Sequence, residues 1–528
     1  MKIVVRLGVF ALFGVLMCSS GGGQDSAIPS SLSQDIDVAP PQTQSLGDVA
    51  RKMRKDISTE VKMTPDDTKK LFEAVDKIFS FASDDSGLPK HSTVKRQLVG
   101  REAVEKYTSE QMKKADFIKR FARSEITMKK FGFLPRDFNL REFLVKANGS
   151  QIAGYYDDET KSISLLNWVP ADRQEPILAH ELTHALQDQN YGLRTWMTAG
   201  NDESRVARKA VVEGQAMVVY VDYLLAPYGR SLKNTPGLIY QMEDPVVKAT
   251  IDSQMTHDAP MILRETGTFP YKEGLIFEGE LLQEGGKQMA FAGAFARPPR
   301  NTHEVLQPRS YLDHENLAAI QIPDVHELLG TQYEAFDSGS IGELDVRALL
   351  RQYGTGRVAD DLSAAWRGGA YTAFRKAAPS PPVADPGTND LALLYVSRWK
   401  TAESAAHFAR FYAVAVTKRY QNAATQAVKG CAGKQCPVSA VQVATEEGPV
   451  VIEQWQDNSV IISESFDQAL ADKLQNTLHD SVSTEVSAHN LPQEELGTRL
   501  FSLPAFQAFS DHLGERMLRQ WLAQKSAF

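Results

Sequence analysis

The chain has 528 residues, of which 42% are apolar and 23% are charged, a balance that is ordinary for soluble globular proteins. This length exceeds the roughly 100–200 residues of one domain, so two or three domains are expected. The formal net charge of −8 excludes the broad basic surface with which proteins bind nucleic acid.

The first 20 residues have the layout of a secretory signal peptide. Lys2 and Arg6 precede a short apolar run, and small residues follow it. The run is shorter than the roughly 20 apolar residues that span a bilayer, and no other segment is longer, so no transmembrane segment is expected. We predict a periplasmic or secreted protein. The segment also resembles a bacterial lipoprotein signal, which would place a lipid anchor on Cys18, although Met17 stands where that class has a small residue.

Composition divides the rest of the chain into three segments. Residues 21–47 are rich in Ser, Gln, Pro and Gly, which predicts a flexible linker. Residues 48–335 begin with charged stretches in which apolar residues recur at helical spacing. From residue 336 strands and helices alternate and a helical tail follows, so residues 336–528 are predicted to form a separate α+β domain. The predicted fold class of the whole chain is α+β.

The second domain shows clear local signals but no motif that indicates chemistry. "DLALLYVSRW" is typical of a strand, "AESAAHFARFYAVAVTKRY" of a helix, and "PVVIEQWQDNSVIISESF" of a hairpin with Asp457 and Asn458 at its turn. Trp366, Trp399 and Trp455 are expected in the core or at an interface.

In the first domain two strands are predicted to precede two long helices. "QIAGYY" and "KSISLL" read as strands, and "DDET" between them reads as a turn. A helix is predicted from about 173 to 189, with Gly192 as its stop. A second helix is predicted from about 203 to 225, ending before Pro227.

The first of these helices contains "HELTH". His180, His184 and Asp188 fall on one stripe, because residues four apart share a helix face. A second stripe, about 200° away around the axis, consists of Leu178, Leu182 and Leu186. The leucine stripe can therefore pack into a core while the histidines face a cleft.

This spacing suits zinc. Two imidazoles one turn apart can both bind one Zn²⁺ ion, and Glu181 beside them can take a proton from a metal-activated water. Asp188 could accept the second ring N–H of a ligand histidine. With 11 histidines in the chain, an HExxH pattern arises by chance only about 0.01 times. The alternative is a pair of histidines on an ordinary surface helix.

Zinc needs a third protein ligand, and Glu213 on the second helix is the leading candidate. It shares its face with apolar residues, where a carboxylate is costly unless something pairs with it. Gly214 would let the two helices approach closely. The alternative is a buried glutamate paired with Arg208 or Arg205.

Four further residues are weaker candidates for the same site. Glu203 is the next choice as a ligand or as a partner of a ligand, and His257 follows it. Tyr271 and Tyr223 are candidates for donating a hydrogen bond to the oxyanion of the transition state, although tyrosine is more often a core residue.

The segment "AHELTHALQDQ", followed by a helix with "EGQA", resembles the zincin metallopeptidases, on the gluzincin side. The resemblance covers residues 150–225 and implies a mostly helical metallopeptidase domain with a small edge sheet. It also implies one zinc ion held by His180, His184 and Glu213, with Glu181 as general base. Met217 departs from thermolysin-like enzymes, which have an aspartate at that position.

The resemblance also gives the predicted strands a role. Proteins of this kind place a sheet edge over the metal helix, and the substrate adds to that edge as another strand. Tyr155 or Tyr156 would then line the cleft. The alternative is a simple hairpin with two half-buried tyrosines.

Cys431 and Cys436 lie in the glycine-rich loop "GCAGKQCPV". In an oxidising compartment two such cysteines are expected to form a disulfide, since no further metal ligands stand nearby.

The sequence therefore predicts a zinc metallopeptidase that hydrolyses peptide or protein substrates and binds no nucleic acid. Two alternatives remain open. One is a catalytically silent zincin scaffold that binds a partner in the cell envelope. The other is a zinc amidase acting on a non-protein amide.

Overall fold

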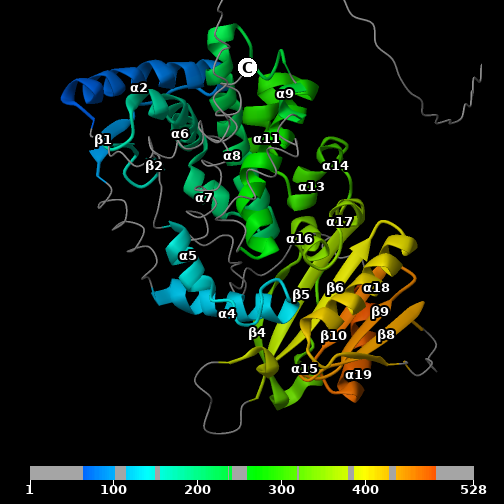
Figure 1. Ribbon diagram of the computed structural model, residues 1–528. Coiled ribbons are helices and arrows are strands. Elements are labelled where there is room, and N and C mark those ends of the chain that lie inside the picture. Colours follow the sequence, from blue (N-terminus) through cyan, green and yellow to red (C-terminus); the bar gives the residue numbers. More distant parts are fainter. Residues whose placement is uncertain are drawn as a thin grey trace, which may run out of the picture. The chain divides into compact units, whose positions relative to one another are not determined.

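The computed structural model describes residues 63–100, 115–148, 155–235, 237–240, 259–317, 320–377, 386–426, 428 and 436–482, all within one compact unit, Glu60–Phe528. These residues form helices and two separate sheets, which confirms the predicted α+β fold class (Figure 1). Among the described helices, none combines the length and the apolar character needed to span a membrane.

The helices of the first part are α2 (Pro65–Ser86), α4 (Ala115–Phe131), α5 (Leu140–Asn148), α6 (Ala171–Tyr191), α7 (Leu193–Thr198), α8 (Asp202–Leu225), η1 (Ala226–Tyr228), α9 (Gly237–Tyr240), α11 (Met261–Gln288), the π-helical turn η3 (Met289–Gly293), α12 (Ala294–Ala296), α13 (Thr302–Leu306) and α14 (Pro308–Leu312). Those of the second part are α15 (His326–Leu329), η4 (Gly330–Gln332), α16 (Glu343–Tyr353), α17 (Gly356–Ser363), η5 (Thr388–Asp390), α18 (Ala402–Arg419) and α19 (Gln468–Val482).

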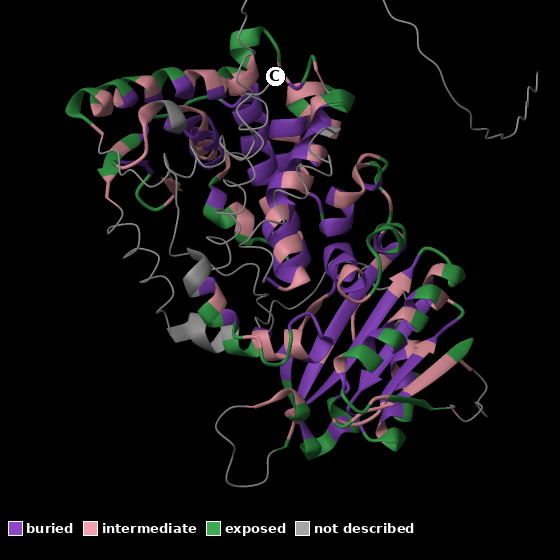
Figure 2. Cartoon of the chain, in the orientation of Figure 1, coloured by how far each residue is buried: buried purple, intermediate pink, exposed green. Residues whose placement is uncertain are grey.

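Helices α6, α8 and α11 pack together and form the centre of the helical part, and α2 packs on α6 (Figure 1). Buried residues run along much of α8 and α11 (Figure 2). The predicted leucine stripe of α6, Leu178, Leu182 and Leu186, is buried in this core. Since the leucines occupy one side of α6, its histidine stripe is directed elsewhere.

The two predicted helices are confirmed with small changes at their ends. The first spans Ala171–Tyr191, and Gly192 follows it with a left-handed φ of 64°. The second spans Asp202–Leu225. Its start is fixed by Asn201, whose side chain accepts a hydrogen bond from the Ser204 N–H at 2.9 Å.

The prediction that Gly214 brings α6 and α8 together is wrong. Gly214 faces Gly274 on α11, and the two glycines let the backbones of α8 and α11 meet directly. A Cβ atom on Gly214 would lie 2.5 Å from the carbonyl carbon of Gly274. The close approach therefore sets the position of α8 from the side of α11.

A three-stranded sheet lies beside α6. Its order is β1 (Lys95–Val99), β3 (Ser162–Leu166), β2 (Tyr155–Asp157), with β1 parallel and β2 antiparallel to β3. The predicted hairpin corresponds to β2 and β3. Strand β1 has an exposed and irregular burial pattern, and its sequence does not alternate in polarity, so it was not predicted.

The second part is a seven-stranded antiparallel sheet with the order β4-β5-β6-β10-β9-β8-β7. Its strands are β4 (Tyr333–Ser340), β5 (Trp366–Lys376), β6 (Leu391–Trp399), β7 (Ala424–Gln426), β8 (Ser439–Ala444), β9 (Val450–Gln454) and β10 (Ser459–Glu464). The predicted strand, helix and hairpin of this region are present as β6, α18 and β9–β10.

Alternate residues of β6 enter two different cores. Leu393, Tyr395 and Trp399 pack on the side of α18, where Tyr395 and Trp399 contact Phe408. Leu394 and Val396 join the core that includes residues of α15 and α19. Both faces of the sheet are therefore covered, and the three tryptophans expected in the core are all buried.

Residues of α18 and of the loops beside the sheet bind the carboxyl end of α4. Arg419 donates to the carbonyl oxygens of Lys130 at 3.0 Å and Phe131 at 2.6 Å. The Lys130 ammonium, fully buried, donates to Glu447 at 2.8 Å and to Ser465 at 2.7 Å. Buried charges need such partners, since an unpaired one would cost several kcal/mol.

The predicted boundary after residue 335 falls inside β4.

We expect Gly214→Ala to lower the free energy of unfolding by about 1–3 kcal/mol, because the added methyl group must push α8 away from α11. The measurement is the shift in the thermal or urea unfolding midpoint of the purified protein.

Gly356→Ala is the control, since Gly356 is also a helical glycine, the first residue of α17, but nothing lies within 4 Å of a Cβ atom there. Its midpoint should stay the same or rise slightly. Equal midpoints for the two variants would contradict the assigned role of the glycine contact.

Candidate metal centre

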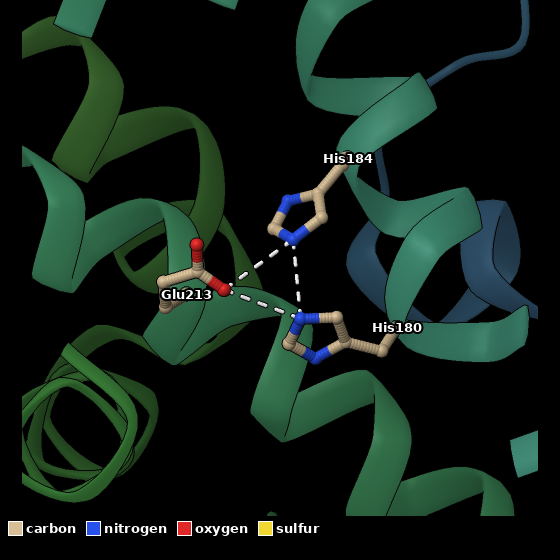
Figure 3. A group of neighbouring side chains, drawn as sticks. All are labelled: His180, His184 and Glu213. Carbon is tan, nitrogen blue, oxygen red and sulfur yellow. Dashed lines mark hydrogen bonds and ion pairs between the residues drawn. The ribbon is translucent and has the colours of Figure 1, made fainter. Parts of the chain in front are cut away.

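Three side chains from two helices converge on one point. His180 and His184 project from successive turns of α6, and Glu213 projects from α8 (Figure 3). The two Nε2 atoms are 3.1 Å apart, and Glu213 Oε2 lies 3.2 Å from His180 Nε2 and 3.4 Å from His184 Nε2. Among the described residues, this is the one cluster of three His, Cys, Asp or Glu side chains that could share a metal ion.

The spacing of these atoms fits zinc. Ligand atoms bound to a tetrahedral zinc ion at about 2.0–2.2 Å lie about 3.3–3.6 Å from one another. The three distances here, 3.1, 3.2 and 3.4 Å, are close to that value. Two imidazoles and one carboxylate are also a ligand set of catalytic zinc sites, which leave a fourth position open.

The electrostatics of the cluster favour the ionised form of Glu213. Burial alone would raise the pKa of Glu213, but the His184 imidazole and the Lys209 ammonium hold it well below its usual range. Lys209 Nζ lies 3.6 Å from Glu213 Oε1, so the two carboxylate oxygens have different partners. Burial would lower the pKa of His184, whereas the Glu213 carboxylate raises it to about 9. The alternative in which Arg208 pairs with Glu213 is not observed: Arg208 binds the Trp196 carbonyl oxygen at 3.1 Å.

Glu181 is held beside the histidines by the small sheet. Its Oε2 accepts the backbone N–H of Tyr156 at 2.8 Å. Burial raises the pKa of Glu181, and the charges of His184 and His180 oppose that rise. Strand β2 thus fixes the orientation of the carboxylate predicted to act as general base.

Asp188 does not bond to either histidine, which corrects its predicted role. Its carboxylate accepts from the Tyr156 hydroxyl at 2.8 Å, from the Lys161 ammonium and from the Leu193 N–H. Burial and the Asp188 carboxylate raise the pKa of Tyr156 well above its usual range. Asp188 therefore fastens α6 to the β2–β3 hairpin instead of orienting a ligand.

Glu203 also lies outside the cluster. Its Oε2 accepts from the Thr302 backbone N–H at 3.0 Å and from the Thr302 hydroxyl at 2.8 Å, so it joins the start of α8 to the start of α13. Ten residues separate Glu203 from Glu213 on the same helix, a rise of about 15 Å. It is therefore not a third ligand for the two histidines.

The two tyrosine candidates have different positions. The Tyr271 ring stacks on the His180 ring, with centroids 6.2 Å apart and an interplanar angle of 21°. Tyr223 donates instead to Glu175 at 3.2 Å and packs against Phe81. Burial and, to a smaller extent, the Glu175 carboxylate raise the pKa of Tyr223 to about 12. Of the two, Tyr271 is the one that contacts the candidate metal centre.

Sequence reasoning missed Gln187 as a partner of the site. Its Oε1 lies 2.9 Å from His184 Nδ1. The signal was available, because Gln187 follows His184 by three residues and so lies on an adjacent part of the same helix face. The sequence analysis proposes only Asp188, whose carboxylate could accept the second ring N–H of a ligand histidine.

Several predictions lie outside the described residues. These are the signal segment with Cys18, the linker 21–47, His257, Cys431 and the helical tail after residue 482. The lipid anchor, the export of the chain and the disulfide between Cys431 and Cys436 therefore stay predictions.

Comparison with protein families gives a match to part of the chain. A family model described as a domain of unknown function (DUF8575) matches residues 331–475, about a quarter of the chain. The matched residues include the whole seven-stranded sheet, and helices α6 and α8 lie outside the match. No curated protein and no solved structure matches the chain.

We expect the purified protein to bind about one equivalent of zinc, and His180→Ala or His184→Ala to remove it, because two ligands alone hold zinc weakly. Metal content after dialysis measures this. His326→Ala is the control, since His326 is exposed and begins α15. Full zinc content in a His180→Ala, His184→Ala double variant would contradict the assignment.

Proposed function

We propose that the chain is a zinc-dependent metallopeptidase that acts outside the cytoplasm. The observation that carries the proposal is the triangle of donor atoms from His180, His184 and Glu213, whose edges of 3.1 to 3.4 Å suit a tetrahedral zinc ion. The HExxH spacing and the position of Glu181 next to the first histidine support hydrolysis as the reaction.

Each side chain of the site has a distinct task in this proposal. A bound zinc ion would polarise the scissile carbonyl group and lower the pKa of a water molecule toward about 7. His180, His184 and Glu213 hold the ion from two helices. Glu181 accepts a proton from the attacking water and passes it to the leaving amine. One carboxylate oxygen of Glu181 accepts a hydrogen bond from the backbone N–H of Tyr156 in β2. Because of this bond, the carboxylate keeps one orientation through both proton transfers.

The small sheet supports a peptide as the substrate. Within the described residues β2 is an edge strand, and an extended peptide can add to such an edge. The Tyr156 N–H points away from β3 and donates to Glu181, so the general base lies at this free edge of β2. A substrate strand next to β2 would therefore bring its backbone close to Glu181.

Two substitutions separate the role of the base from that of the ligand. Glu181→Gln should abolish cleavage of casein or a peptide library while zinc stays bound, because Glu181 is not a ligand. Glu213→Gln should abolish cleavage and weaken zinc binding, because it removes a negatively charged ligand. Hydrolysis rates and zinc dissociation constants of both variants give the result.

Glu175→Gln is the matched control on the same helix as Glu181. Its carboxylate accepts from Tyr223 and is not part of the cluster, so zinc binding and cleavage should be unchanged. Full activity of Glu181→Gln would contradict the proposal. Zinc binding without cleavage of peptides, proteins or cell-wall amides by the wild-type protein would favour the binding-scaffold alternative.

A further inference from the structure

Two fully buried glutamine side chains connect the candidate metal centre to a distant turn. Gln187 lies on α6 and Gln215 on α8, and neither is exposed to solvent. Gln187 Nε2 donates to Gln215 Oε1 at 3.0 Å and to the Val212 carbonyl oxygen at 3.0 Å. Buried amides are costly unless they are fully hydrogen-bonded, so these contacts restrict both side chains strongly.

Backbone carbonyl groups determine which way each amide faces. Gln215 Nε2 donates to the carbonyl oxygens of Ala290 at 2.8 Å and Phe291 at 3.1 Å, both in the π-helical turn η3. A carbonyl oxygen can only accept, so the NH₂ group of Gln215 must face η3 and its oxygen must face Gln187. By the same reasoning, the Val212 carbonyl oxygen and Gln215 Oε1 fix the NH₂ group of Gln187.

The orientation of Gln187 then determines the tautomer of His184. Both amide hydrogens of Gln187 are used, so the atom that lies 2.9 Å from His184 Nδ1 is an oxygen acceptor. Nδ1 must therefore carry a proton. In the neutral ring this leaves the lone pair on Nε2, the atom that lies within 3.4 Å of Glu213.

The same amide also links the two helices that supply the ligands. Val212, whose carbonyl oxygen accepts from Gln187, immediately precedes Glu213. Gln187 therefore contacts one ligand directly and the backbone next to another. A change at Gln187 would disturb both the tautomer of His184 and the spacing between His184 and Glu213.

We infer that Gln187 and Gln215 are positioning residues that keep the proton of His184 on Nδ1 and its Nε2 available to a metal ion. The inference rests on the proposed function, because it assigns these amides to the same zinc site. The carbonyl groups of η3 fix the orientation of the Gln215 amide, Gln215 fixes that of the Gln187 amide, and Gln187 fixes the tautomer of His184. We call this chain of hydrogen bonds the relay.

The test measures zinc affinity by competition with a chelator, with zinc alone as the ligand. Gln187→Met keeps the approximate length of the side chain but provides no acceptor for Nδ1. We expect the zinc dissociation constant to rise about 10–100-fold, as is typical when the partner of a ligand histidine is lost. Gln215→Met should raise it less, because the Val212 carbonyl oxygen still orients Gln187.

Gln189→Met is a matched control on α6. Gln189 also makes three hydrogen bonds, one with the His91 N–H and two with the Ser92 backbone, and none with the cluster. Its loss should lower the melting temperature without changing the zinc dissociation constant. If Gln187→Met binds zinc as tightly as Gln189→Met, the inference is overturned. A larger effect for Gln215→Met than for Gln187→Met would overturn the direction of the relay.

A second measurement needs no variant at the buried amides. In zinc-loaded wild-type protein with ¹⁵N-labelled histidine, the NMR signals of His184 should show a proton on Nδ1 that exchanges slowly with water. Coordination of zinc through Nδ1 would overturn the inference. The two proposals fail differently: no zinc binding by the wild-type protein removes both, whereas His184-dependent zinc binding that ignores Gln187→Met removes only the relay.

Discussion

The buried carboxylate of Glu213 is the constraint on which the arrangement of the helical part depends. A carboxylate in an apolar interior costs several kcal/mol unless charges or hydrogen bonds compensate it. Glu213 finds this compensation on two sides, with the imidazoles of α6 at one oxygen and Lys209 at the other. The next residue, Gly214, packs on Gly274 of α11. Helix α8 is therefore held between α11, where the backbones meet, and α6, where the charged groups meet.

The seven-stranded sheet also helps to position helix α8. The start of α8 is tied to it by Asp202, whose carboxylate accepts from the Ser340 N–H of β4 at 3.0 Å. Glu203 ties the same turn to α13. Arg419, the last residue of α18, donates to two carbonyl oxygens at the end of α4. The region matched by the domain of unknown function thus contacts the helical part through specific polar groups, and its effect on the metal centre would be exerted through the position of α8.

The sequence predicted the parts of the site that depend on local spacing. His180, Glu181 and His184 share one helix, so their relation follows from helical periodicity, and the leucine stripe follows from the same rule. Glu213 could be proposed because a carboxylate among apolar residues needs a partner. Contacts between distant segments were not predictable in this way. Nothing local shows that Asp188 binds Tyr156, that Gly214 meets Gly274, or that Gln215 binds carbonyl groups 75 residues further on, because these depend on how the helices pack.

The most direct test of the account is to locate the metal. Diffraction from crystals of the zinc-loaded protein, recorded on both sides of the zinc absorption edge, shows zinc by its anomalous signal. The account predicts one strong peak at about 2.0–2.2 Å from His180 Nε2, His184 Nε2 and a Glu213 oxygen. A zinc peak bound by other residues, or no peak between α6 and α8 in protein that contains stoichiometric zinc, would contradict it.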